Sequence, residues 1–104
     1  MLLADHNRGM ATWLFQCNPA KFRIFDAVAD GRPIRNWAAK QNRTQMRPGD
    51  DAVLWVGGAD RGYPAGVYAI GRIRSVEFAG RVDSRYWSSG ATPEPRHFID
   101  IKFR

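Results

Sequence analysis

Residues 65–78 read Ala-Gly-Val-Tyr-Ala-Ile-Gly-Arg-Ile-Arg-Ser-Val-Glu-Phe and predict the longest β-strand of the chain. Apolar and polar residues alternate over part of this run, as in a strand with one buried face. Gly66 and Gly71 interrupt it, and a glycine inside a strand marks a bulge or a bend. This stretch therefore predicts a small, strongly curved sheet or barrel.

Shorter strands are predicted on both sides of this run. Residues 12–17 are rich in β-forming side chains and end at the turn Asn18-Pro19. Residues 51–56 follow the turn Pro48-Gly49-Asp50, and residues 97–104 alternate as a final strand. The chain ends on that strand, which is compatible with a domain cut short at its C-terminus.

Helical segments are predicted between the first two of these strands. Phe22, Phe25 and Val28 recur at helical spacing and predict a short helix over residues 21–29. The remaining predicted pieces are a short extended segment at residues 34–37 and a helical turn at residues 44–46. The fold class that follows is α+β: a small curved β-barrel of about five to six strands, with short helices inserted after the first strand.

The length and composition limit the domain organisation. At 104 residues the chain has room for one domain, and its 44% hydrophobic content is enough for a core. We expect a flexible lead-in over residues 1–11 and a domain over residues 12–104.

The charge favours a polyanionic partner. The net charge is +6 and the pI about 10.2, with arginine dominating over lysine. Arginine suits phosphate binding and base stacking, although a GC-rich genome also raises its frequency. Cys17 is the only cysteine, which excludes a disulfide framework and indicates a reducing, cytoplasmic setting. No apolar run approaches the ~20 residues that a membrane span needs.

Trp37 lies in unusual surroundings. It belongs to the polar and basic stretch of residues 35–43, where a core tryptophan is out of place. A flat aromatic ring among amide and arginine side chains suits the binding of a nucleobase. Trp37 is therefore predicted to be a ligand-binding wall rather than a core residue.

Signatures of catalysis are lacking in the sequence. His6 and His97 have neither metal-ligand spacing nor a nucleophile partner. Asp50 and Asp51 follow a turn, where carboxylates usually serve turn geometry. Gly57-Gly58 lacks the lysine and the helix of a phosphate loop. We expect a non-enzyme without metal or cofactor.

Four segments occur in an order and spacing that resemble an EVE domain of the PUA-like superfamily. They are residues 13–19, Trp37 with Asn42, residues 49–55 and residues 66–71, and the resemblance spans residues 13–104. EVE domains are similar to YTH domains, which are PUA-like β-barrels that flip N6-methyladenine of RNA into an aromatic cage. EVE domains are implicated in recognising modified bases in DNA.

The resemblance implies a pocket at the end of the first strand. Its residues would be Gln16, Cys17, Asn18, Trp37, Ala38, Asn42 and Trp87. Asn18 would read a base edge, and Trp37 and Trp87 would be cage walls. Trp55 is included as well, since its strand position suits a core and a cage residue equally. The arginines expected to hold phosphates are Arg35, Arg43, Arg47 and Arg85.

One departure concerns the segment after the first strand. Many EVE domains read Lys-Thr-Glu-Pro there, whereas this chain has Gln16-Cys17-Asn18-Pro19. A glutamate that could accept from an exocyclic amine is absent, which leaves the preferred base open. Purely structural roles stay open for four residues. Trp13 could belong to the core, Trp87 could cap the barrel, Cys17 could be a small buried residue and Asn18 could form a turn.

The resulting hypothesis is a reader of a modified base, such as 5-methylcytosine, 5-hydroxymethylcytosine or N6-methyladenine, with DNA favoured over RNA. In a bacterium it would be nucleoid-associated and would direct a restriction or repair nuclease. One alternative is a small enzyme acting on modified nucleosides, for which Lys40 and Glu77 are poor acid–base candidates. Another is a general RNA-binding accessory domain.

Overall fold

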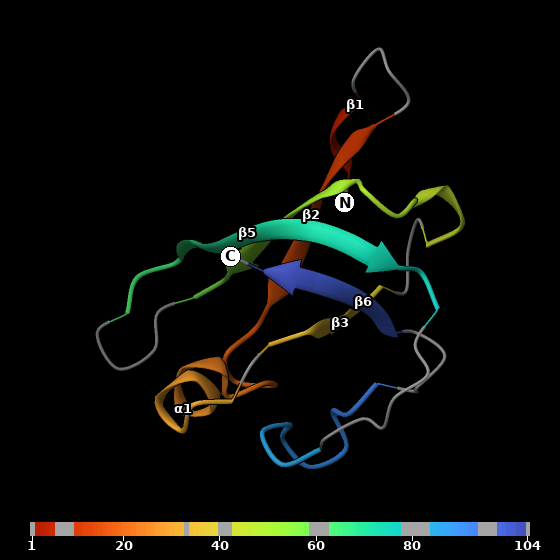
Figure 1. The fold of residues 1–104 in the computed structure, drawn as a ribbon. Helices are drawn as coiled ribbons and strands as arrows, with labels where there is room; N and C mark the ends of the chain where they lie inside the picture. Colours follow the sequence, from red (N-terminus) through yellow and green to blue (C-terminus); the bar gives the residue numbers. More distant parts are fainter. Residues whose placement is uncertain are drawn as a thin grey trace.

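The computed structural model describes residues 2–5, 10–32, 34–39, 43–58, 63–77, 84–93 and 98–103. These residues form one six-stranded mixed sheet with a short α-helix beside it (Figure 1). The strands are β1 (Leu2–Asp5), β2 (Ala11–Cys17), β3 (Asn36–Ala38), β4 (Asp51–Val56), β5 (Gly66–Ser75) and β6 (Phe98–Phe103). The helices are α1 (Ile24–Ala29) and the 3₁₀ turn η1 (Arg43–Gln45).

The strand order is β1-β2-β4-β5-β6-β3. The pair β2–β4 is parallel and the other pairs are antiparallel. Parallel neighbours need a long crossover connection, and here α1, β3 and η1 lie within it. The sheet curves visibly along β5 and β6 (Figure 1). Among the described strands it has two edges, β1 and β3, so it is consistent with a curved PUA-like sheet while the predicted closed barrel is not confirmed.

The predicted strands at residues 12–17, 51–56, 65–78 and 97–104 are confirmed as β2, β4, β5 and β6. The predicted helix over residues 21–29 begins only at Ile24, because Phe22 is engaged in an isolated β-bridge with Trp87. No helix in the part that the structure describes is long and apolar enough to cross a membrane.

The beginning of the chain differs from the flexible lead-in that the sequence predicts. Residues Leu2–Asp5 form β1, which pairs antiparallel with β2. An edge strand left unpaired exposes a row of backbone hydrogen-bonding groups, and β1 satisfies that row along β2.

The core lies on one face of the sheet. Alternate residues of β2 and β4 are buried, which is the period-2 pattern of a strand with one covered face. The helix α1 adds Ile24 and Ala27 to this core. The side chains buried from the central strands are Trp13, Phe15, Cys17, Ala52, Leu54, Val56, Ile73, Ile99 and Ile101.

Gly71 allows β5 to approach β6 closely. A Cβ at this position would lie 2.7 Å from Phe103 Cα and would clash with the backbone carbonyl of Lys102. Gly66, in contrast, would place a Cβ in open space. The pairing of β5 also shifts register against both of its neighbours. These shifts lie between Val67 and Ala69 and between Ile73 and Ser75, rather than at either glycine. Gly71 is the position that requires a glycine, because of its close approach to β6.

Asp50 connects the turn before β4 to the start of β2. It is buried, with 3% of its surface exposed. Its carboxylate accepts hydrogen bonds from the backbone N–H of Ala11 (3.2 Å), from Trp13 Nε1 (2.9 Å) and from the backbone N–H of Arg47 (3.0 Å). The turn role predicted for this carboxylate is confirmed, and the same group also fixes the indole of Trp13.

Replacing Asp50 by alanine is expected to lower the free energy of unfolding by about 3 kcal/mol or more, because three donors lose their acceptor and each buried unsatisfied group costs roughly 1–3 kcal/mol. The matched control is Asp51→Ala. The Asp51 carboxylate lies 3.6 Å from Arg72 Nε in a largely exposed ion pair, and its loss should cost less than about 1 kcal/mol. Urea unfolding of the two variants measures both values, and equal losses would contradict the role given to Asp50.

Candidate functional site

A cavity of about 500 Å³ opens where β2 and β4 end. Because the two strands are parallel, Cys17 and Val56 are register partners and the chain leaves both strands at the same edge of the sheet. The segments after them, Asn18 and Gly57-Gly58, line the cavity. Its full lining in the described chain is Gln16, Cys17, Asn18, Lys21, Phe22, Trp37, Trp55, Gly57, Gly58 and Trp87.

Most of the residues predicted to bind a base meet at this cavity. Those in its lining are Gln16, Cys17, Asn18, Trp37, Trp55 and Trp87. Ala38 is not in the lining, and Asn42 lies outside the described residues. Lys21 and Phe22 also line the cavity without having been predicted there: Phe22 has helical spacing with Phe25, but the helix begins after it.

Three aromatic rings pack against one another at the cavity. The Phe22 ring lies 5.2 Å from Trp37 and 4.8 Å from Trp87, measured between ring centroids. The two indoles lie 6.2 Å apart with their planes at 42°, which is the separation of a contacting aromatic pair. Trp37 and Trp87 are therefore neighbours within one cluster, rather than parallel walls with a base-sized gap between them.

Trp37 is a core residue, which corrects the prediction that a core tryptophan is out of place in this segment. Only 4% of its surface is exposed, and its Nε1 donates to the backbone carbonyl of Gln16 at 3.1 Å. Trp37 pairs with Ile99 in the three-residue strand β3, where its side chain is buried and its two neighbours are only partly so. Polar neighbours in sequence thus do not prevent burial, because a strand alternates its faces.

Trp55 is the tryptophan with the most accessible ring. It is 37% exposed, while Leu54 and Val56 on either side are buried. It is the register partner of Gln16 on β2 and of Val67 on β5. Of the two readings left open by the sequence, core or cage, the exposed position excludes the first.

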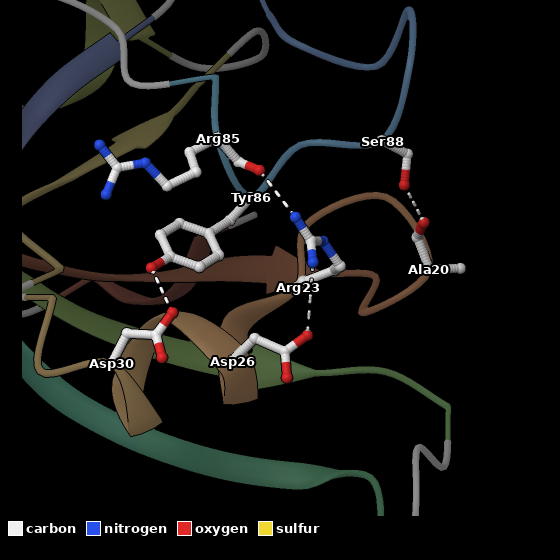
Figure 2. Close-up of polar contacts among 7 residues, drawn as sticks. All are labelled: Ala20, Arg23, Asp26, Asp30, Arg85, Tyr86 and Ser88. Atoms are coloured by element: carbon white, nitrogen blue, oxygen red, sulfur yellow. Dashed lines mark hydrogen bonds and ion pairs between the residues drawn. The ribbon is translucent and has the colours of Figure 1, made fainter.

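Backbone hydrogen bonds fix the loop that carries Trp87. The Arg23 N–H donates to the Tyr86 carbonyl at 2.8 Å, and the Ser88 N–H donates to the Lys21 carbonyl at 2.7 Å. The guanidinium of Arg23 donates to the Arg85 carbonyl at 2.8 Å (Figure 2). The segment after β2 and the loop at residues 84–88 are thereby joined into one wall of the cavity.

Tyr86 ties the same loop to the end of α1. Its hydroxyl donates to the Asp30 carboxylate at 2.7 Å (Figure 2), and this hydrogen bond raises the pKa of Tyr86. Arg23 lies 5.7 Å over the Tyr86 ring and 3.7 Å from the Asp26 carboxylate. The position of Trp87 is thus determined by the residue just before it, whose role no sequence motif indicates.

The arginines predicted to bind phosphate are not in the lining of this cavity. Arg35 instead lines a second cavity, Arg47 donates its backbone N–H to Asp50, and Arg85 contributes its carbonyl to the loop contact described above. The Arg43 side chain lies outside the described residues. Lys21 is the cation of the described lining.

The second cavity, of about 870 Å³, lies between α1 and the strands β4, β5 and β6. It is mostly apolar, with Phe25 stacked on Tyr63 at 4.1 Å. The cations Arg32, Arg35, Arg74 and Lys102 also line it. Within the described ranges, no group of three or more His, Cys, Asp or Glu side chains could hold a metal ion.

A family model described as the EVE domain matches residues 11–104. This chain belongs to the EVE domain family. Comparisons with curated proteins and with solved structures gave no match. The matched range includes all strands from β2 to β6 and every lining residue of the smaller cavity. Membership of the EVE family suggests a PUA-like module that binds nucleic acid, and the aromatic cluster at the cavity is compatible with that role.

Cys17 of this EVE domain should be unreactive in the folded state. Cys17 is 2% exposed, its thiol donates to the Phe22 carbonyl, and burial raises the pKa of this thiol to about 12. At mildly alkaline pH the thiol stays protonated, and the thiolate is the reactive form. A disulfide reagent such as Ellman's should therefore modify it only after unfolding in urea. Rapid reaction of the folded protein would contradict this placement.

Proposed function

We propose that this EVE domain is a non-catalytic reader that binds a modified nucleobase flipped out of a nucleic acid, with DNA preferred over RNA. The observation that supports it most is the meeting of three tryptophans with Gln16 and Asn18 at one cavity. A concave site with aromatic walls and a few polar groups is the usual form of a site for a flat ligand.

The tryptophans have different parts in this proposal. Trp55 and the half-buried Trp87 offer ring surface to a ligand. Trp37 supports them from the core, since it contacts Phe22 and binds the Gln16 carbonyl.

The energies are compatible with base flipping. Unstacking a base from a duplex costs a few kcal/mol, and each aromatic contact returns roughly 1–3 kcal/mol. One buried methyl group adds only about 0.8 kcal/mol. Selectivity for a modified base must therefore come from fit in a cavity with fixed walls, and the hydrogen bonds of the loop at residues 84–88 supply that rigidity.

Phosphate contacts would add affinity without selectivity. The net charge of +6 supports such contacts, and the predicted arginines would make them from outside the cavity. In a bacterial cell the module would bring an associated restriction or repair nuclease to modified DNA of the nucleoid. Of the two acid–base candidates named for the enzyme alternative, Glu77 is not in the described lining, and Lys40 lies outside the described residues.

The test is a titration of oligonucleotides that differ only in one central base, either unmodified or carrying 5-methylcytosine, 5-hydroxymethylcytosine or N6-methyladenine. At constant salt the wild type should bind at least one modified form more tightly. Trp55→Ala should remove that preference and weaken binding roughly tenfold or more, because it removes a stacking surface. Trp37→Ala is unsuitable, since truncating a buried tryptophan costs about 3–5 kcal/mol of stability.

The matched control is Tyr63→Ala. Tyr63 is also an exposed aromatic residue, at 47%, but it lies outside the lining of the smaller cavity. The Tyr63→Ala variant should keep the preference for the modified base. Equal binding of all oligonucleotides by the wild type, or equal losses in the two variants, would contradict the proposal.

A further inference from the structure

Around the smaller cavity, side-chain donors are available to a ligand, whereas many backbone acceptors are bonded within the protein. The lining carbonyls between Gln16 and Phe22 each accept a hydrogen bond from within the protein. The Gln16 carbonyl accepts from Trp37 Nε1 at 3.1 Å, and the Cys17 carbonyl accepts from the Gly57 N–H at 2.8 Å. The Asn18 carbonyl accepts from the N–H groups of Lys21 (2.9 Å) and Phe22 (3.0 Å).

The same holds for the next two residues of the lining. The Lys21 carbonyl accepts from the Ser88 N–H at 2.7 Å. The Phe22 carbonyl accepts from the Ile24 N–H at 2.8 Å and from the Cys17 thiol. From Gln16 to Phe22, each backbone carbonyl that belongs to the described lining therefore has a donor within the protein.

Asn18 is oriented by its own turn. Its side-chain oxygen accepts from the Ala20 N–H at 2.9 Å, which also settles which amide atom is oxygen and which is nitrogen. The Nδ2 group, with its two N–H donors, is the part of this exposed side chain left for a ligand. Asn18 is thus a donor at the cavity and not an acceptor.

The other polar side chains of the lining add mainly donors. Lys21 is exposed and carries an ammonium group with three donors and no acceptor. The indole nitrogens of Trp55 and Trp87 can only donate. No aspartate or glutamate belongs to the described lining. Gln16 is the lining side chain whose amide can both donate and accept a hydrogen bond.

We infer that this cavity selects a base presenting oxygen acceptors, with an oxidised pyrimidine that carries a carboxylate as the best ligand. This inference rests on the proposed function of the same site. A carboxylate or carbonyl oxygen would accept from Asn18 Nδ2 and from Lys21, and charge-assisted hydrogen bonds are the stronger kind. Cytosine, 5-methylcytosine and 5-carboxylcytosine share the 4-amino group, so the carboxylate is what distinguishes 5-carboxylcytosine at these donors. N6-methyladenine presents no base oxygen and would leave the donors unpaired.

The experiment compares oligonucleotides with a single central 5-carboxylcytosine, 5-methylcytosine, N6-methyladenine or unmodified cytosine at constant salt. The wild type should bind 5-carboxylcytosine about tenfold or more tighter than 5-methylcytosine, and N6-methyladenine least among the modified bases.

Two variants test the two groups that donate to the oxygen in this proposal, Asn18 Nδ2 and the Lys21 ammonium group. Asn18→Asp keeps the acceptor for the Ala20 N–H but replaces the ligand donor by an acceptor, so it should abolish the preference for 5-carboxylcytosine. Lys21→Met keeps the length of the side chain and removes its charge, and it should reduce the same preference several-fold. Lys102→Met is the control: it removes a lysine that lies outside the lining of this cavity, and it should leave the preference for 5-carboxylcytosine unchanged. Circular dichroism confirms that the variants are folded.

The outcomes separate this inference from the function on which it rests. One outcome is that 5-methylcytosine or N6-methyladenine binds as tightly as 5-carboxylcytosine, and that Trp55→Ala abolishes the binding of both modified oligonucleotides. In that case the reader function stands and the selectivity for oxygen acceptors is overturned. A preference for 5-carboxylcytosine that survives both Asn18→Asp and Lys21→Met overturns it as well. Equal binding of every oligonucleotide, unchanged in Trp55→Ala, overturns the function and the inference together.

Discussion

The parallel pairing of β2 with β4 is the constraint on which the rest of the structure depends. It sends both strands out of the sheet at the same edge, with Gln16 beside Trp55 and Cys17 beside Val56. A parallel pair also requires a long connection, and this one contains α1 and β3. The cavity, its exposed tryptophan and the segment that carries Asn18 and Lys21 all follow from this pairing.

The second requirement is that the cavity wall formed by residues 84–88 is held in a defined position. Residues 84–88 arrive from far along the chain and join the segment after β2 through the Phe22–Trp87 bridge and the hydrogen bonds of Arg23 and Ser88. Of the carbonyls in the cavity lining, these contacts engage that of Lys21, which accepts from the Ser88 N–H. The wall thus combines hydrogen bonds between the two segments with the ring contact of Phe22 and Trp87.

Sequence patterns predicted the elements whose signal is local. The strand at residues 51–56 follows a Pro-Gly-Asp turn and is a run of apolar residues, and six of the eight residues predicted to bind a base line one cavity. The burial of Trp37 was not predictable, because a strand of three residues is too short to show which face is buried. Phe22 and Tyr86 were missed for another reason: their roles depend on contacts between segments distant in sequence.

The most direct test of the account is the response of the four indole N–H signals to a modified-base oligonucleotide, followed by ¹H–¹⁵N NMR. Trp55 and Trp87 border the cavity, whereas the Trp13 indole is buried and bound to Asp50. We expect the signals of Trp55 and Trp87 to shift on saturation and that of Trp13 to stay in place. Binding that leaves the Trp55 and Trp87 signals unmoved would contradict the claim that this cavity receives the base.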